Sequence, residues 1–124
     1  IKNKKNFFHI KSVNYNQIGN YLSYANVCII PFKSNELSKF ILPNKIFEYS
    51  IIEKPFVLTN FNPELKDIYP DFLIANSHIE FSKLILNQIK NPSDTSKLKT
   101  FALKFEWNRI SNQFRSMISD TLKK

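Results

Sequence analysis

Two short apolar runs decide the fold: Val27-Cys28-Ile29-Ile30, which Pro31 ends, and Pro55-Phe56-Val57-Leu58. Neither run alternates apolar with polar residues, and a continuous apolar run is typical of a strand that helices cover on both faces. A helix is predicted between them, over 43–52, because Pro43 suits the first turn, where its missing N–H has no partner to lose. Strand, helix and strand in this order predict an α/β fold with a parallel sheet.

The remaining segments continue this alternation. Strands are predicted over 7–10 and 72–75, and helices over 15–25 and 77–90. The apolar positions of the last of these helices are Ile79, Leu84, Leu86 and Ile89. From position 94 onward the chain is helical in character, with an apolar stripe at spacings of three and four residues: Trp107, Ile110, Phe114, Met117 and Ile118. The segments 33–41 and 60–63 are predicted to be loop and turn.

Composition bounds the class of protein. With 124 residues and 43% hydrophobic residues, the chain has the length of one domain and enough apolar surface for a core. The formal net charge of +8 suits nucleic acid, an anionic membrane surface or a phosphate-bearing ligand. Its basic residues are scattered, with modest clusters at 2–5 and 97–104, and no aromatic-interleaved basic stripe is present. A generally basic face is therefore favoured over a dedicated polyanion site.

Cysteine and hydropathy give two further limits. Cys28 is the only cysteine, which excludes a disulfide or a cysteine-based metal site within the chain, and its apolar surroundings predict a buried structural thiol. No apolar stretch approaches the roughly 20 residues of a membrane-spanning helix, and no signal peptide is visible. We therefore expect a soluble, cytoplasmic protein. His9 and His78 are expected to be structural or surface residues.

The helix that begins at Pro43 is the first candidate for chemistry. Ligands of parallel α/β sheets collect beyond the carboxyl ends of the strands, where loops enter helix N-termini. The free N–H groups of such a terminus suit a diphosphate, and Lys45 adds a positive charge. Glu48 lies on the same side of the helix as Asn44 and Lys45, and a carboxylate accepts hydrogen bonds from a ribose diol. From spacing alone, however, the favoured interpretation is a Lys45–Glu48 surface pair worth under about 1 kcal/mol.

A family resemblance favours a ligand-binding site over a surface ion pair at the start of this helix. Three segments resemble, in order and spacing, the donor-binding half of GT-B glycosyltransferases. They are Ile29-Ile30-Pro31-Phe32, then Leu42-Pro43-Asn44-Lys45-Ile46-Phe47-Glu48-Tyr49, and then Lys54-Pro55-Phe56-Val57. The resemblance is particularly to the group 1, family 4-like enzymes of bacterial surface polysaccharides. Pro63-Glu64-Leu65, Glu80-Phe81, Trp107 and Arg109 also look like family positions, so that the resemblance covers nearly the whole chain.

The resemblance implies a fold, a reaction and a site. It implies that residues 1–124 are a partial, Rossmann-like donor-binding domain with C-terminal helices, whose acceptor domain and first strands would precede Ile1. The reaction would transfer a sugar from a nucleotide diphosphate to a polysaccharide, lipid-linked or other acceptor, without metal or cofactor. The chain would be cytoplasmic or peripheral on the inner face of the cell membrane. The implied donor-binding residues are Lys45, Glu48, Asn44, Pro43, Phe32 and Lys33.

Two positions depart from the family pattern. Phe40 stands where many relatives carry the first of two glutamates, and Glu36 is at the wrong spacing to replace it. Glu53 stands where relatives usually have the glycine that suits a left-handed helix end. No catalytic residue is assigned, and the chain alone is expected to be inactive. The alternatives are a non-catalytic α/β binding or interaction module and, less favoured, a nucleic-acid-binding domain.

Overall fold

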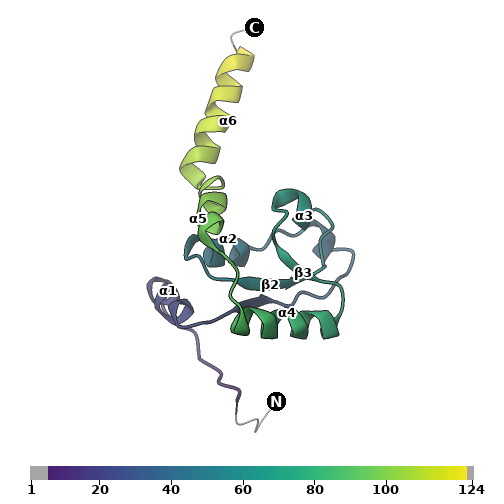
Figure 1. Ribbon diagram of the computed structural model, residues 1–124. Coiled ribbons are helices and arrows are strands. Elements are labelled where there is room, and N and C mark those ends of the chain that lie inside the picture. The colour runs from purple at the N-terminus through teal and green to yellow at the C-terminus, as the bar shows by residue number, and fades with distance from the viewer. Residues whose placement is uncertain (1–5, 123–124) are drawn as a thin grey trace.

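The computed structural model describes residues 6–122 and shows an α/β fold (Figure 1). A parallel sheet has the strand order β1-β2-β3, with β1 paired to β2 and β2 to β3. The elements in chain order are α1 (Tyr15–Ser23), β1 (Cys28–Ile30), the 3-10 helix η1 (Ser38–Phe40), α2 (Asn44–Ile51), β2 (Phe56–Thr59), α3 (Leu65–Ile68), β3 (Leu73–Ala75), α4 (His78–Lys90), α5 (Ser96–Leu103) and α6 (Trp107–Leu122). The predicted fold class and parallel sheet are confirmed at this level.

The two faces of the sheet carry different helices (Figure 1). Alternate strand residues such as Ile30 and Leu58 belong to the main core, together with Ile46 of α2, Leu65 of α3 and Phe101 of α5. α4 packs against β2 and β3 on the opposite face, where Val57 is fully buried. Successive crossovers through α2 and α3 lie on one face, as connections of a single hand in a parallel sheet require.

The helix predicted over 43–52 is confirmed with one residue less at each end. Pro43 is the N-cap, and its extended backbone (ψ 136°) prevents it from joining the first turn. At the other end the N–H of Lys54 donates to the carbonyl of Tyr49, and the N–H of Glu53 donates to the carbonyl of Ser50. Both N···O distances are 3.0 Å. This pair of bonds is a Schellman ending, which needs a left-handed residue after the C-cap. Glu53 takes that conformation with a φ of 54°, although it is not glycine.

Glu53→Gly should stabilise the chain by about 0.5–1 kcal/mol. Relief of the clash between Cβ and the carbonyl in the left-handed region exceeds the extra entropy that glycine gives the unfolded chain. Urea denaturation followed by circular dichroism measures the change. Glu53→Ala is the control, because it removes the charge but keeps Cβ; equal gains in both variants would show that charge, and not backbone conformation, is responsible.

α1 is attached to the sheet through Lys54. The side-chain ammonium of Lys54 donates to the carbonyl oxygens of Ser23 (2.6 Å) and Ala25 (3.1 Å), at and just beyond the end of α1. A cation at a helix C-terminus satisfies carbonyls that have no partner within the helix and complements the negative end of its dipole. The other end of α1 is capped by Asn14, whose side chain accepts from the N–H of Asn16. The predicted helix over 15–25 is thus confirmed, ending at Ser23.

Lys54→Met should destabilise the chain by about 1–2 kcal/mol, because two carbonyls lose a charged donor while the apolar stem is kept. Thermal or urea unfolding measures this loss. Lys39→Met is the matched control: its ion pair with Glu36 is exposed, so its removal should cost under about 0.5 kcal/mol. A loss no larger for Lys54→Met than for Lys39→Met would refute the capping role.

Two strand predictions need correction. Segment 7–10 is not a strand: it pairs with no other strand of the described residues, and Phe7, Phe8 and Ile10 are exposed. β-prone residues form a strand only where a partner accepts their backbone hydrogen bonds. β1 is present, but helices do not cover both of its faces as predicted. Ile29 is 44% exposed, and the main contacts of α4 are with β2 and β3.

The helix 77–90 is confirmed, but its buried face differs from the predicted one. Ile79, Leu86 and Ile89 are exposed, whereas Gln88 is buried. The buried Gln88 amide oxygen accepts from the N–H and hydroxyl of Ser93, so a polar residue occupies a core position with its acceptor satisfied. The sequence also missed η1 and α3, each of which is only about one turn long: η1 lies in the segment 33–41, predicted to be loop, and α3 lies in a segment for which no element was predicted.

The helical character beyond position 94 is confirmed by α5 and α6. α6 extends away from the body of the domain (Figure 1), and none of its residues is buried. Cys28 is buried as predicted, and burial raises the pKa of its thiol. No helix within residues 6–122 is long and apolar enough to cross a membrane. The basic cluster at 2–5 lies outside the described residues.

Candidate functional site

α2 presents one face to the core and another to a surface groove. Ile46, Tyr49 and Ser50 are buried against the rest of the domain. Asn44 and Glu48 lie one turn apart on a different face, with Asn44 exposed and Glu48 half-buried. The core packing of α2 therefore determines the direction in which these two predicted site residues face.

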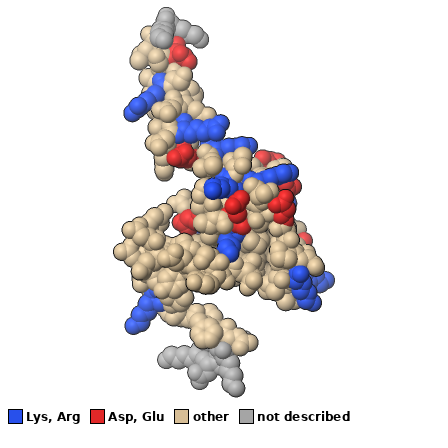
Figure 2. Space-filling view, turned by 60° about the vertical axis from the view of Figure 1, so that its left-hand side comes forward, with Lys and Arg blue, Asp and Glu red and all other residues tan. Residues whose placement is uncertain are grey.

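A groove of about 700 Å³ runs along this second face of α2. Besides Asn44 and Glu48, α2 contributes Phe47 and Ile51 to its lining; Leu42 just before α2, together with residues of α1, α5, α6 and the α5–α6 connection, supplies the rest. Figure 2 shows the molecule hollowed between α1 and the base of α6, with few charged residues around the hollow. The volume lies within the range of small-molecule sites, roughly 300–1,000 Å³.

The other four predicted site residues lie outside the lining of this groove. Lys45 is exposed on the first turn of α2, beside the groove residue Asn44. Pro43 is buried. Phe32 and Lys33 follow β1; Phe32 is half-buried and Lys33 exposed. The structure therefore brings Asn44 and Glu48 together in one groove. Lys45 is not part of the lining but follows Asn44 on the first turn of α2, a position that we call the groove margin.

The start of α2 offers unused hydrogen-bond donors. Pro43 provides no side-chain cap, and within residues 6–122 no hydrogen bond is found from the backbone N–H of Asn44 or Lys45. The first N–H groups of a helix carry the positive end of its dipole, and an anion can bind there. Lys45 adds a side-chain cation at the same turn. A phosphate at this position would thus meet two N–H donors and an ammonium group.

Asn62 holds the loops at the carboxyl ends of β1 and β2 in place. It is 3% exposed; its amide nitrogen donates to the carbonyl of Ile41 (3.1 Å), and its amide oxygen accepts from the N–H of Glu64 (2.9 Å). The hydroxyl of Thr59 donates to the carbonyl of Phe32 (2.5 Å). The bond to Ile41 holds the segment that leads into α2, and the bond to Glu64 holds the start of α3.

Asn62→Ala should destabilise the chain by about 2 kcal/mol, because it leaves a carbonyl and an N–H without their partner in a buried place. Equilibrium urea unfolding measures the loss. Asn60→Ala is the control, since the amide of Asn60 bonds Asn76 at the exposed surface, and its loss should be under about 1 kcal/mol. Similar losses in the two variants would show that the Asn62 bonds are not the tie between the loops.

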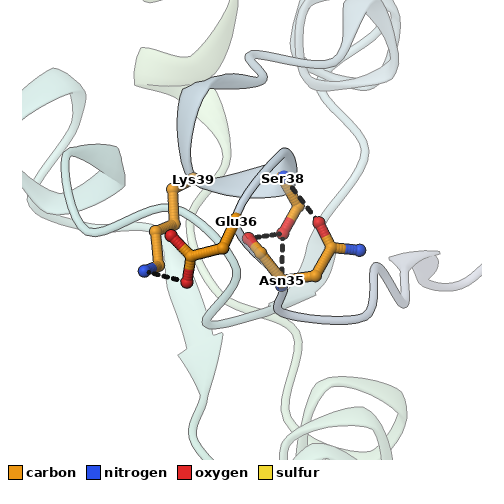
Figure 3. Close-up of polar contacts among 4 residues, drawn as sticks. All are labelled: Asn35, Glu36, Ser38 and Lys39. Carbon is orange, nitrogen blue, oxygen red and sulfur yellow. Dashed lines mark hydrogen bonds and ion pairs between the residues drawn. The ribbon is translucent and has the colours of Figure 1, made fainter.

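The loop 33–41 is ordered by its own polar side chains (Figure 3). Asn35 and Ser38 bond reciprocally: the N–H of Ser38 donates to the Asn35 amide oxygen, and the N–H of Asn35 donates to the Ser38 hydroxyl. Glu36 pairs with Lys39 at 2.7 Å, and its side chain is 92% exposed. The carboxylate nearest upstream of α2 thus forms a surface ion pair and lies outside the groove lining.

The electrostatics of α2 are set by burial and by Glu48. Burial raises the pKa of the Tyr49 hydroxyl, and repulsion from the ionised forms of Cys28 and Glu48 raises it further. His9 and His78 are exposed, as the sequence predicted for surface residues. Among residues 6–122 no group of three or more His, Cys, Asp or Glu side chains is placed to hold a metal ion.

Several groove residues come from the far end of the chain. Phe105 and Glu106 of the α5–α6 connection and Trp107 and Ile110 of α6 line it together with α2. The apolar stripe predicted Trp107 and Ile110 to share one helix face, but no sequence signal marked Phe105 or Glu106 as groove residues. Their place depends on the packing of α5 against α2, which brings residues some 60 positions apart into contact.

Comparisons with models of protein families, with curated proteins and with solved structures find no match to this chain. The class that the structure itself defines is an α/β domain with a three-stranded parallel sheet and a groove along its α2 helix.

Proposed function

We propose that this chain binds a nucleotide-diphosphate sugar and supplies the donor half of a glycosyltransferase site. The observation that carries the proposal is the position of Glu48 and Asn44 in a groove beside the uncapped start of α2. These are residues for which the resemblance to GT-B enzymes implies donor contacts, and Lys45 at the groove margin is another. The proposal is supported by the fact that the candidate contacts for the ribose and for the diphosphate come from the first two turns of one helix.

Each group has a distinct task in this proposal. The N–H groups at the start of α2 and the Lys45 ammonium bind the diphosphate, whose negative charge grows as the sugar departs. The Glu48 carboxylate accepts hydrogen bonds from the ribose hydroxyls. No metal or cofactor enters this scheme, and the acceptor, a glycan or lipid-linked glycan, would be held by another domain. Peripheral membrane attachment and a cytoplasmic location belong to the same proposal.

Lys45→Ala and Glu48→Ala should each weaken binding of uridine or guanosine diphosphate by about 10-fold, the loss expected for one charged hydrogen-bonding group. Isothermal titration calorimetry at low salt measures the affinities. Lys83→Ala is the matched control, because Lys83 is exposed on α4, across the sheet from α2. Equal affinity in all four proteins would remove the site assignment.

The non-catalytic binding module shares this site and differs only in turnover. Transfer of labelled sugar by a protein that contains this chain and its acceptor domain, lost on Glu48→Ala, distinguishes the enzyme from the module. A nucleic-acid-binding domain would instead show a salt-dependent shift of random DNA or RNA. On the face shown in Figure 2, Lys and Arg lie among Asp and Glu and form no continuous basic stripe.

A further inference from the structure

Part of the groove lining is aromatic, and we call its residues Phe47, Phe105 and Trp107 the aromatic wall. Phe47 and Phe105 pack with their ring centres 5.0 Å apart, and Phe105 in turn contacts Phe101 at 5.3 Å. Trp107 follows directly at the start of α6 and lines the same groove, with 81% of its surface exposed. Within residues 6–122 it stacks on no other aromatic ring. Most of the indole surface is therefore available to a ligand, whereas the neighbouring Phe105 packs against Phe47 and the buried Phe101.

The charges of the groove limit what it can hold. Its lining contains the carboxylates of Glu48 and Glu106 and the amide of Asn44, but neither lysine nor arginine. A phosphate within the groove would meet two like charges, which disfavours it. A neutral group with hydroxyl donors is suited to the carboxylates, and a heterocycle is suited to the aromatic wall. A nucleoside combines both, and its phosphates would then project toward Lys45 at the groove margin.

We propose that Trp107 stacks on the base of the bound nucleotide and so positions the nucleoside, with its ribose on Glu48. This inference rests on the proposed donor-binding function and adds a positioning residue from α6 to it. Base stacking on an aromatic ring is tolerant of sequence and strong enough to matter for a small ligand. The geometry assigns the two halves of the donor to different places: the base and ribose to the groove, the diphosphate to the start of α2.

The chain offers a direct probe, because Trp107 is its only tryptophan. Uridine diphosphate and guanosine diphosphate should each change the Trp107 fluorescence in a saturable way, whereas inorganic pyrophosphate, which has no base, should leave it unchanged. By calorimetry, Trp107→Leu should weaken nucleotide binding by about 10-fold and pyrophosphate binding not at all. Trp107→Phe should retain affinity within about 3-fold, since it keeps a ring that can stack.

Phe114→Leu is the matched control on the same helix: Phe114 is 63% exposed and lies outside the groove lining. Circular dichroism of each variant checks that the fold is retained, which the exposure of both positions favours. If the nucleotides bind in a manner that depends on Glu48 but neither change the fluorescence nor respond to Trp107→Leu, the stacking role is wrong and the proposed function stands. If no nucleotide binds the unaltered chain, both proposals are overturned.

Discussion

Ile46 and Tyr49 of α2 are buried in a core that also contains residues of the sheet and of α5. This packing determines the orientation of α2 and therefore the direction in which its other residues face. Parallel strands need a crossover connection, so β1 and β2 can pair only if the segment between them packs back on the sheet. Once the apolar face of α2 is used for that packing, Asn44 and Glu48 must face outward. The orientation of the candidate site is thus a consequence of core packing.

The end of α2 links the core to α1. The left-handed turn at Glu53 reverses the chain within two residues, which places Lys54 where its ammonium reaches the carbonyls that end α1. A residue with a backbone strain of this kind persists only where its surroundings hold it, and here two Schellman bonds do so. Because α1 supplies Tyr15 to the groove lining, the attachment of α1 through Lys54 also helps to form the groove.

The sequence predicted those helices and strands whose pattern of apolar residues depends only on the local geometry of the chain. The strands β1, β2 and β3 were predicted from short apolar runs, the helices α1 and α4 from apolar residues at helical spacing, and α2 from Pro43 at its start. The sequence failed where a distant partner decides the outcome. Segment 7–10 has strand-forming residues but no strand to pair with, and Ile29 lies at the sheet edge beyond α4. Hydropathy also gave no indication that Gln88 is buried. Its amide oxygen can leave water because the N–H and hydroxyl of Ser93 donate hydrogen bonds to it.

The same distinction applies to the candidate site. The donor-binding role of these residues came from the family resemblance and stays a prediction, but the position of Asn44, Lys45 and Glu48 on neighbouring faces of one helix was predictable from helix spacing. The aromatic wall was not, since Phe105 reaches the groove only through its contacts with Phe47 and Phe101 across α2 and α5. The two sets of residues are also chemically unlike, cationic at the start of α2 and apolar with carboxylates within the groove. A ligand that matches both sets of residues needs an anionic end and an aromatic end, linked by a part that carries hydroxyl groups.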